Sequence, residues 1–154
     1  MIGNDIIDLQ LAARESNWQR RGYLDKIYTP AEQAMIHASS DADKMVWLLW
    51  SCKEAVYKIV HRETGVHAYN PLKFHCKENT VVYNDQIYFT QSTVSASCIY
   101  TVAVSKKILL NSIRTVDEIE GIVKDVHGIP YLNGQPASCT HHGRFKATLL
   151  LLPG

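Results

Sequence analysis

Net charge, long apolar runs and cysteine are all scarce in this sequence of 154 residues. Sixteen lysines and arginines balance fifteen aspartates and glutamates, which leaves a formal charge of +1. Nucleic-acid-binding proteins usually carry a positive field over the whole domain, so we do not expect this protein to bind nucleic acid. A charged partner would have to bind a local patch of charged side chains. The longest aliphatic run, Leu149 to Leu152, is far too short to cross a bilayer, so no membrane span is expected.

The first apolar segment carries Asp5 and Asp8, and we therefore expect no signal peptide. The cysteines stand more than twenty residues apart and form no C-x-x-C or Cys/His pattern typical of zinc. We expect reduced thiols and a cytoplasmic location.

The length of the chain predicts one domain spanning residues 1–154. Helical periodicity dominates the first part, whereas short runs rich in valine, tyrosine, threonine and isoleucine follow from Leu72 to Ser105. This order predicts an α+β fold in which an antiparallel sheet packs against a long central helix.

The predicted central helix runs from Ser39 to Arg62 without glycine or proline. Glu54, Lys58 and His61 stand at positions i, i+4 and i+7, so a carboxylate, an amine and an imidazole share one face. That set is sufficient for acid–base chemistry. The alternative is an ordinary surface Glu–Lys pair, which contributes only about 0.2–0.5 kcal/mol.

Residues 1–9 predict a buried first strand that contains an acid, Asp5. Charged side chains are rarely buried without a partner, and a metal ion is one of the few partners that suit a carboxylate there. Asp5 is therefore a candidate metal ligand. A helix cap or a turn is the alternative for Asp5 and the favoured interpretation of Asp8.

A helix over Leu9–Arg21, closed by Gly22, is predicted next, and its arginines form a local basic face: Arg14, Arg20 and Arg21. Thr29-Pro30-Ala31-Glu32 then forms the start of a short helix that ends near Ala38. Ser40 or Asp41 is expected to cap the central helix.

Val81–Tyr83 and Ile87–Phe89 flank Asn84-Asp85, which predicts a β-hairpin, and Ile99–Val104 predicts a longer partner strand. Residues 115–126 predict another helix, stopped by Gly128-Ile129-Pro130. In the last part, residues 138–145 are predicted to form a turn between two strands, and residues 147–152 the buried second strand.

Three stretches stand in an informative order: Gly3-Asn4-Asp5-Ile6, the segment from Trp50 to Lys58 that reads W-S-C-K-E-A-V-Y-K, and Ser138-Cys139-Thr140-His141. They resemble the G-x-D-I, W-x-x-K-E-A-x-x-K and S-x-S-H signatures of the phosphopantetheinyl transferase superfamily. Tyr28-Thr29-Pro30-Ala31-Glu32 is similar to the family's aromatic-T-x-x-E segment. The position of G-x-D-I at the start of a chain of this length resembles the holo-acyl-carrier-protein synthase type.

This resemblance implies coenzyme A as donor, Mg²⁺ as metal, a serine of an apo carrier protein as acceptor, and a homotrimer with sites between subunits. By motif position, Asp5 and Glu54 match the metal ligands, and Lys58 matches the lysine that assists deprotonation of the carrier serine. Lys53 and His141 match residues expected near the phosphates of coenzyme A.

The sequence departs from the family pattern at Ile7, where the larger members carry a second acid, so water is expected in place of a third carboxylate. The last motif reads S-x-T-H and keeps its hydroxyl. His142 and Arg144 lie beyond the motif, where they are candidate phosphate partners or solvent-facing side chains.

The leading hypothesis is a Mg²⁺-dependent transfer of 4'-phosphopantetheine from coenzyme A to a carrier serine, which releases adenosine 3',5'-bisphosphate. Two alternatives remain: a non-catalytic relative that binds a carrier protein or coenzyme A, and a metal-dependent phosphohydrolase. The carrier, whether of fatty acid, polyketide or other synthesis, stays open.

Overall fold

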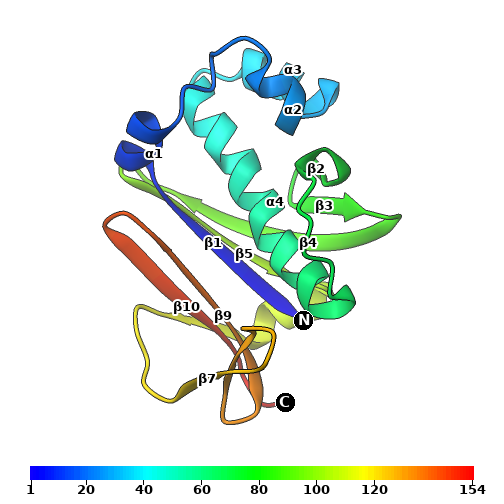
Figure 1. The fold of residues 1–154 in the computed structure, drawn as a ribbon, viewed down its shortest axis with the longest axis vertical. Helices are drawn as coiled ribbons and strands as arrows, with labels where there is room; N and C mark the ends of the chain where they lie inside the picture. The colour runs from blue at the N-terminus through cyan, green and yellow to red at the C-terminus, as the bar shows by residue number, and fades with distance from the viewer.

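Strand β1 (Ile2–Asp8) forms one edge of a five-stranded antiparallel sheet in the computed structural model, which describes all 154 residues (Figure 1). Its register with β5 places Ile2 opposite Val104 and Asp8 opposite Cys98. The strand order is β1-β5-β4-β3-β2, with β2 over His75–Lys77, β3 over Thr80–Tyr83, β4 over Gln86–Val94 and β5 over Cys98–Val104. The expected α+β fold, a long helix packed against antiparallel strands, is confirmed.

Helix α4 (Ala42–Thr64) crosses one face of this sheet. The Asp41 side chain accepts a hydrogen bond from the Lys44 amide at its start, and Gly65 ends it in the left-handed conformation. Gly3 allows the close approach of β1, because a Cβ atom there would lie 2.1 Å from the carbonyl oxygen of Ala55. The glycine of the first motif is therefore required by strand–helix packing.

The first predicted helix is shorter than expected. Helix α1 (Leu9–Glu15) ends at Ser16, whose φ of −138° is extended, and Gly22 precedes a separate helix, α2 (Tyr23–Ile27). Between them the indole of Trp18 donates a hydrogen bond to Asp43. The chain thus leaves helical geometry to dock on α4, and the three arginines lie on two segments instead of one helical face.

Helix α3 (Pro30–Ala38) begins as predicted, with a complete capping box between Thr29 and Glu32. The predicted hairpin is also present. Asn84 and Asp85 have φ values of +48° and +64°, and this pair of positive values suits a tight two-residue hairpin turn.

The helix predicted over residues 115–126 is wrong. The chain forms β6 (Ile113–Val116) and β7 (Ile122–Lys124), separated by Gly121 with a φ of +87°. Strand β6 pairs with β10, and the apolar side chains of Val123 and Val126 are exposed. The available strand edge and the break at Gly121 overrode the helical spacing of the apolar residues.

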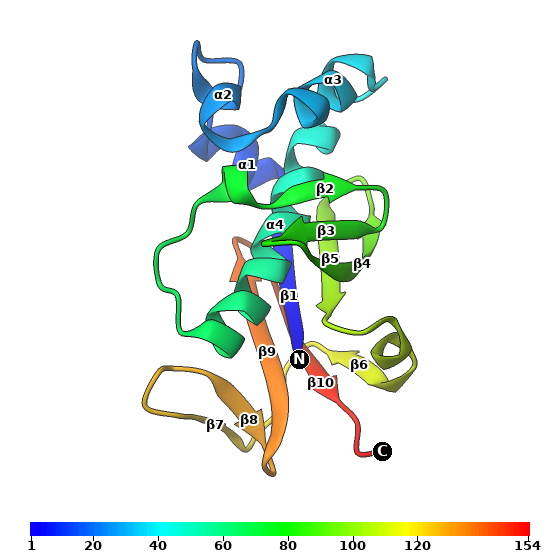
Figure 2. The same ribbon diagram turned by 90° about the vertical axis from the view of Figure 1, so that its right-hand side faces the viewer.

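A second antiparallel sheet has the order β6-β10-β9-β8-β7, with short helices η1 (Pro71–Lys73) and η2 (Lys107–Ser112) elsewhere in the chain. Figure 2 shows β9 and β10 running beside β1. The bounds are β8 over Pro130–Leu132, β9 over Gln135–His142 and β10 over Phe145–Leu151. The predicted pair of terminal strands is present, but the turn is confined to residues 143–144, and residues 138–142, predicted as turn, belong to β9. No helix in the structure has the length and apolar character needed to cross a membrane.

The free edge of β1 is bound by side chains of β9. Alternate backbone amides of β1 donate hydrogen bonds of 2.9–3.1 Å to alternate side chains of β9, in the pairs Asn4–Ser138, Ile6–Thr140 and Asp8–His142. Because strand side chains alternate, residues 138, 140 and 142 point the same way. This side-chain ladder joins the two sheets and brings the N- and C-terminal motifs together.

Candidate active site

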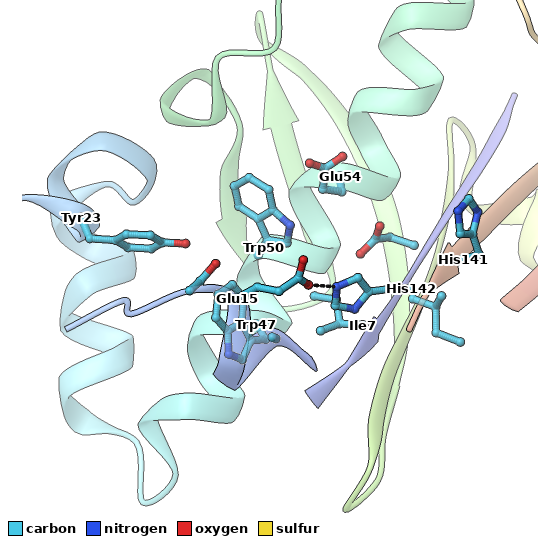
Figure 3. A pocket seen from close by; sticks show the side chains of 12 residues that line it. Ile7, Glu15, Tyr23, Trp47, Trp50, Glu54, His141 and His142 are labelled. Atoms are coloured by element: carbon cyan, nitrogen blue, oxygen red, sulfur yellow. Dashed lines mark hydrogen bonds and ion pairs between the residues drawn. The ribbon is translucent and has the colours of Figure 1, made fainter. Parts of the chain in front are cut away.

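A cavity of about 310 Å³ opens between β1, the N-terminal helices, α4 and the tip of the β9–β10 hairpin (Figure 3). Its polar side includes Asp5, Glu54 and His141, and its apolar wall includes Trp47 and Trp50. The cavity therefore unites side chains from all three sequence motifs.

Asp5 reaches this cavity from the face of β1 that packs against α4. Its Oδ2 atom is buried and has no hydrogen-bond partner. Burial raises the pKa of the carboxyl to about 7; the Lys58 charge acts in the opposite direction, and the Glu54 charge raises the pKa further. A buried carboxylate oxygen without a partner is costly for the fold, so Asp5 remains a candidate ligand-binding group.

Glu54 projects from the middle of α4 into the same cavity. Burial raises the pKa of its carboxyl as well, and the nearby Lys58 charge lowers it in part. Two carboxylates in a poorly hydrated site repel each other when ionised, so a cation between them would relieve the repulsion.

The donor set fits a hard divalent cation of the Mg²⁺ type. Mg²⁺ takes oxygen ligands, commonly one or two carboxylates with substrate phosphates, and keeps several waters. No cluster of three or more histidine, cysteine or acidic side chains is present, so the protein itself supplies few ligands. At the position of a third acid, Ile7 is buried in the core and lines the cavity wall.

Lys58 lies one helical turn beyond Glu54. Its ammonium donates hydrogen bonds to the carbonyl oxygens of Asn4 at 2.6 Å and Cys139 at 3.1 Å, so it links β1, β9 and α4. Burial lowers the pKa of Lys58, while the charges of Asp5 and Glu54 raise it. Its ammonium is therefore close to both carboxylates and held by two neutral acceptors.

The last motif divides between structure and cavity. The hydroxyls of Ser138 and Thr140 accept hydrogen bonds from backbone amides of β1. The Nδ1 atom of His142 accepts a hydrogen bond from the Asp8 amide, and its Nε2 atom lies 2.7 Å from Glu15 Oε1. The side chain of His141 leaves the opposite face of β9 and lines the cavity. The hydroxyls of S-x-T-H are thus held by strand β1.

A second cavity of about 190 Å³ lies on the far side of Lys58 and was not anticipated from the sequence. Three more basic side chains line it: His61, Arg62 and Lys124. The Nη2 atom of Arg62 donates to the Pro130 and Ala137 carbonyls, while Nη1 is buried without a partner. The position of His61 at i+7 from Glu54 is visible in the sequence, but strand β7, which brings Lys124 to the same cavity, was predicted as part of a helix. We call this the basic cavity.

A family model described as the 4'-phosphopantetheinyl transferase superfamily matches residues 1–106, more than half of the chain. The chain belongs to this superfamily. A relative from Schizosaccharomyces pombe, named L-aminoadipate-semialdehyde dehydrogenase-phosphopantetheinyl transferase, is 35% identical over 57 residues. The match covers 37% of this chain and 21% of the relative, so the aligned region spans about a fifth of that protein.

The part matched to the superfamily contains Asp5, Glu54 and Lys58, but it ends before β9. The candidacy of His141 therefore rests on the resemblance of the last motif and on its position in the fold, and that of Arg144, which lies beyond the motif, rests on position alone. Of these two, the structure brings only His141 into the cavity.

The expectation for Lys53, the lysine of the superfamily's K-E-A motif, needs correction. Its side chain is fully buried, and the ammonium bonds to Glu32 at 2.6 Å and to the carbonyls of Ile27 and Pro71. The helical turn of 100° between neighbouring residues carries Lys53 into the core while Glu54 faces the cavity. Lys53 joins α2, α3 and η1 to α4, and no part of it is free to hold a phosphate.

Arg144 is also engaged within the protein. Its Nε and Nη2 atoms each donate to the Asp8 carboxylate at 2.9 Å, and its backbone amide donates to the same carboxylate. Its side chain remains about half exposed. Its Nε and Nη2 atoms therefore hold the β9–β10 tip against β1, and its expected role as a phosphate partner stays a prediction.

Proposed function

We propose that this protein transfers 4'-phosphopantetheine from coenzyme A to a serine of an apo carrier protein and depends on Mg²⁺. The observation that carries the proposal is the meeting of Asp5 and Glu54 in one cavity beside Lys58, in a chain of this superfamily. Asp5 Oδ2 has no protein partner, as expected for an atom that binds a ligand.

In this reaction the serine oxygen attacks the phosphorus that bears pantetheine, and the pyrophosphate P–O bond breaks. Adenosine 3',5'-bisphosphate leaves with the bonding electrons, and the serine proton passes to a base. When bound, Mg²⁺ would supply neutralisation of the charge that develops on the phosphate oxygens. Asp5 and Glu54 would hold that ion, beside the apolar wall that Trp47 and Trp50 form.

Lys58 is the residue proposed to receive the serine proton, directly or through a water. Burial favours its neutral form, and its location beside both carboxylates places it within reach of a nucleophile at the metal. The alternative role is a fixed positive charge that stabilises the transition state.

The basic cavity supports coenzyme A as the donor. His61, Arg62 and Lys124 surround a space next to Lys58, and the buried Nη1 of Arg62 is free to donate to an anion. Phosphate oxygens are strong acceptors for such side chains. His141, at the edge of the first cavity, is the other proposed phosphate partner.

Carrier recognition is proposed to use the basic residues next to the site. Arg20 stacks over the ring of Tyr23 at 5.8 Å, and Tyr23 lines the cavity that holds Asp5 and Glu54. Acidic carrier helices would meet Arg14, Arg20 and Arg21 at this rim. The homotrimer of the holo-acyl-carrier-protein synthase type is part of the same proposal.

The direct test is incubation of the protein with coenzyme A, Mg²⁺ and a panel of apo carriers from the same genome, followed by mass spectrometry of each carrier. We expect a mass gain of one phosphopantetheine group on one or more carriers. Cleavage of coenzyme A by water without an acceptor would favour the phosphohydrolase alternative. Binding without any product would favour the non-catalytic relative.

A further inference from the structure

Tyr69 lies in the segment between α4 and η1, outside all the sequence motifs. Its ring stacks on Tyr57 with centroids 4.6 Å apart and an interplanar angle of 23°, and it lies 5.8 Å from the ring of Trp50. Phe74 closes a third side, with centroids 5.5 Å apart. These contacts fix the position of the ring.

The contacts place Tyr69 over the helical turn that carries Glu54. Trp50, Glu54 and Tyr57 stand at positions i, i+4 and i+7, which form one stripe along α4. A ring that packs against the first and last members of the stripe lies near the middle one, and the charge of Glu54 acts on the Tyr69 hydroxyl. Tyr69 is thus a neighbour of the proposed metal ligand.

The hydroxyl of Tyr69 is buried and has no hydrogen-bond partner. Burial raises the pKa of this hydroxyl, and among nearby charges Glu54 raises it most, with Cys76, Asp5 and Tyr28 adding to the effect. Glu54 itself forms no ion pair, and only burial and Lys58 shift its pKa. The Tyr69 hydroxyl is therefore a buried donor without a partner, which is uncommon in a protein interior, and Glu54 is an acceptor nearby that no protein group binds.

We propose that Tyr69 is a positioning residue for the metal site, and that its hydroxyl donates a hydrogen bond to the Glu54 carboxylate when that carboxylate turns to bind a divalent cation. One Glu54 oxygen then faces the cation and the other is held by Tyr69. Carboxylates that ligate metals are commonly oriented by such outer partners, and their loss lowers metal affinity or activity about 10–100-fold. The inference rests on the proposed role of Glu54 as a ligand.

The test is Tyr69→Phe in the full chain, because phenylalanine keeps the stacked ring and removes only the hydroxyl. Titration calorimetry with Mn²⁺ alone, without coenzyme A or carrier, should show at least about tenfold weaker binding than the wild type. The unfolding temperature in EDTA should stay the same or rise, because an unpaired buried hydroxyl has been removed. In the transfer assay, half-maximal rate should need more Mg²⁺, whereas the rate at saturating Mg²⁺ should approach that of the wild type.

Tyr83→Phe is the matched control, because Tyr83 belongs to the same aromatic cluster and stacks on Phe74 at 4.6 Å. This variant should bind Mn²⁺ as the wild type does. Wild-type Mn²⁺ affinity in Tyr69→Phe would overturn the inference, as would a fall of its unfolding temperature in EDTA without a change in affinity.

Glu54→Ala separates the two proposals. Suppose that Glu54→Ala abolishes Mn²⁺ binding, that Tyr69→Phe weakens Mn²⁺ binding, and that the wild type modifies no carrier. The positioning role then stands and the transferase function fails. If carriers are modified and Tyr69→Phe binds Mn²⁺ normally, only the positioning role fails. Mn²⁺ binding that survives Glu54→Ala, or no Mn²⁺ binding by the wild type, would refute the positioning role directly.

Discussion

Asp5 and Asp8 lie three residues apart on the same strand, yet their surroundings are opposite. Asp8 caps α1 through the amides of Gln10 and Leu11 and accepts three further hydrogen bonds from Arg144. Asp5 faces α4 with a buried oxygen that has no partner. The hydrogen bonds from Arg144 hold the pKa of Asp8 below its usual range, whereas burial raises the pKa of Asp5 to about 7.

The difference separates a structural acid from a candidate functional one. The hydrogen-bonding capacity of Asp8 is used within the protein, so its contribution is to the fold. The burial of Asp5 is offset only in part, by Lys58 and Ser51, which is expected where a ligand completes the site. Lys53 and Glu54 repeat the contrast on α4: one is fully paired in the core, the other faces the cavity.

The largest effect is expected from removal of either proposed metal ligand. Asp5→Ala and Glu54→Ala should each lower Mg²⁺-dependent transfer by at least about a thousandfold, because charge stabilisation by the metal accounts for several kcal/mol of the barrier. Neither change should unfold the chain, since each removes a poorly solvated charge. Carrier mass spectrometry and circular dichroism measure the two properties. Near-normal turnover in either variant would remove the basis of the metal site.

Lys58 tests which chemistry the site performs. As a base it should lose about 10²–10⁴ in rate on change to arginine, because arginine cannot deprotonate, and the rising limb of the pH–rate profile should disappear. If Lys58 is instead a fixed positive charge, Lys58→Arg should keep much of the transfer rate and the rising limb of the pH–rate profile. We expect the first result. Wild-type rates of Lys58→Ala at every pH would eliminate both roles.

Lys53 should behave as a core residue. Lys53→Ala leaves Glu32 buried without its counter-ion and should destabilise the fold by about 3–5 kcal/mol in urea denaturation. The double change Lys53→Met with Glu32→Gln removes both charges but keeps an acceptor for the Thr29 and Cys76 amides, and should recover part of that loss. If Lys53→Ala kept full stability but raised the KM for coenzyme A, Lys53 would be a phosphate-binding residue after all.

The two aspartates should give opposite dependences of stability on pH in EDTA. The folded state holds the Asp5 proton more tightly than the unfolded state, so the free energy of unfolding should fall as pH rises from about 4 to about 7. The stabilising contribution of Asp8 is present above its unfolded pKa of about 3.9 and is lost as pH falls below it.

Urea denaturation of the wild type, Asp5→Asn and Asp8→Asn as a function of pH measures both contributions. Asp5→Asn should flatten the decline between about pH 4 and about pH 7, and Asp8→Asn should remove part of the loss at acid pH. An unchanged slope in Asp5→Asn would show that this carboxyl is not perturbed.

The smallest effect is expected at the basic rim. Charge reversal of Arg14, Arg20 and Arg21 together should raise the KM for the carrier roughly several-fold, because charges at the rim of an interface mainly change the rate of association. The KM should also depend less on salt concentration. Coenzyme A binding should not change. Normal modification of the carrier by the triple variant at low salt would show that these side chains are only solvated.

Local patterns predicted much of the fold, because turn and capping chemistry depend on neighbouring residues. The capping box at Thr29, the Asp41 cap of α4 and the Asn84-Asp85 hairpin are examples. The sequence failed where a distant edge competed with local preference. Residues 113–116 became a strand because β10 offered hydrogen bonds, and the helix after Leu9 ended early because Trp18 docks on α4.

The sequence by itself determined which residues could carry the chemistry: two acids and a lysine within motifs of the superfamily, and a glycine where strand and helix must touch. Only the tertiary structure decided which side chains face the cavity. Adjacent residues differ by 100° on a helix and by 180° on a strand, so Lys53 and Glu54, or Thr140 and His141, receive different roles from one motif. Three features depend on residues that are distant in the chain: the pairing of Asp8 with Arg144, the burial of the unpaired atoms of Asp5 and Tyr69, and the basic cavity. They exist only because β9 and the segment after α4 are packed against β1 and α4.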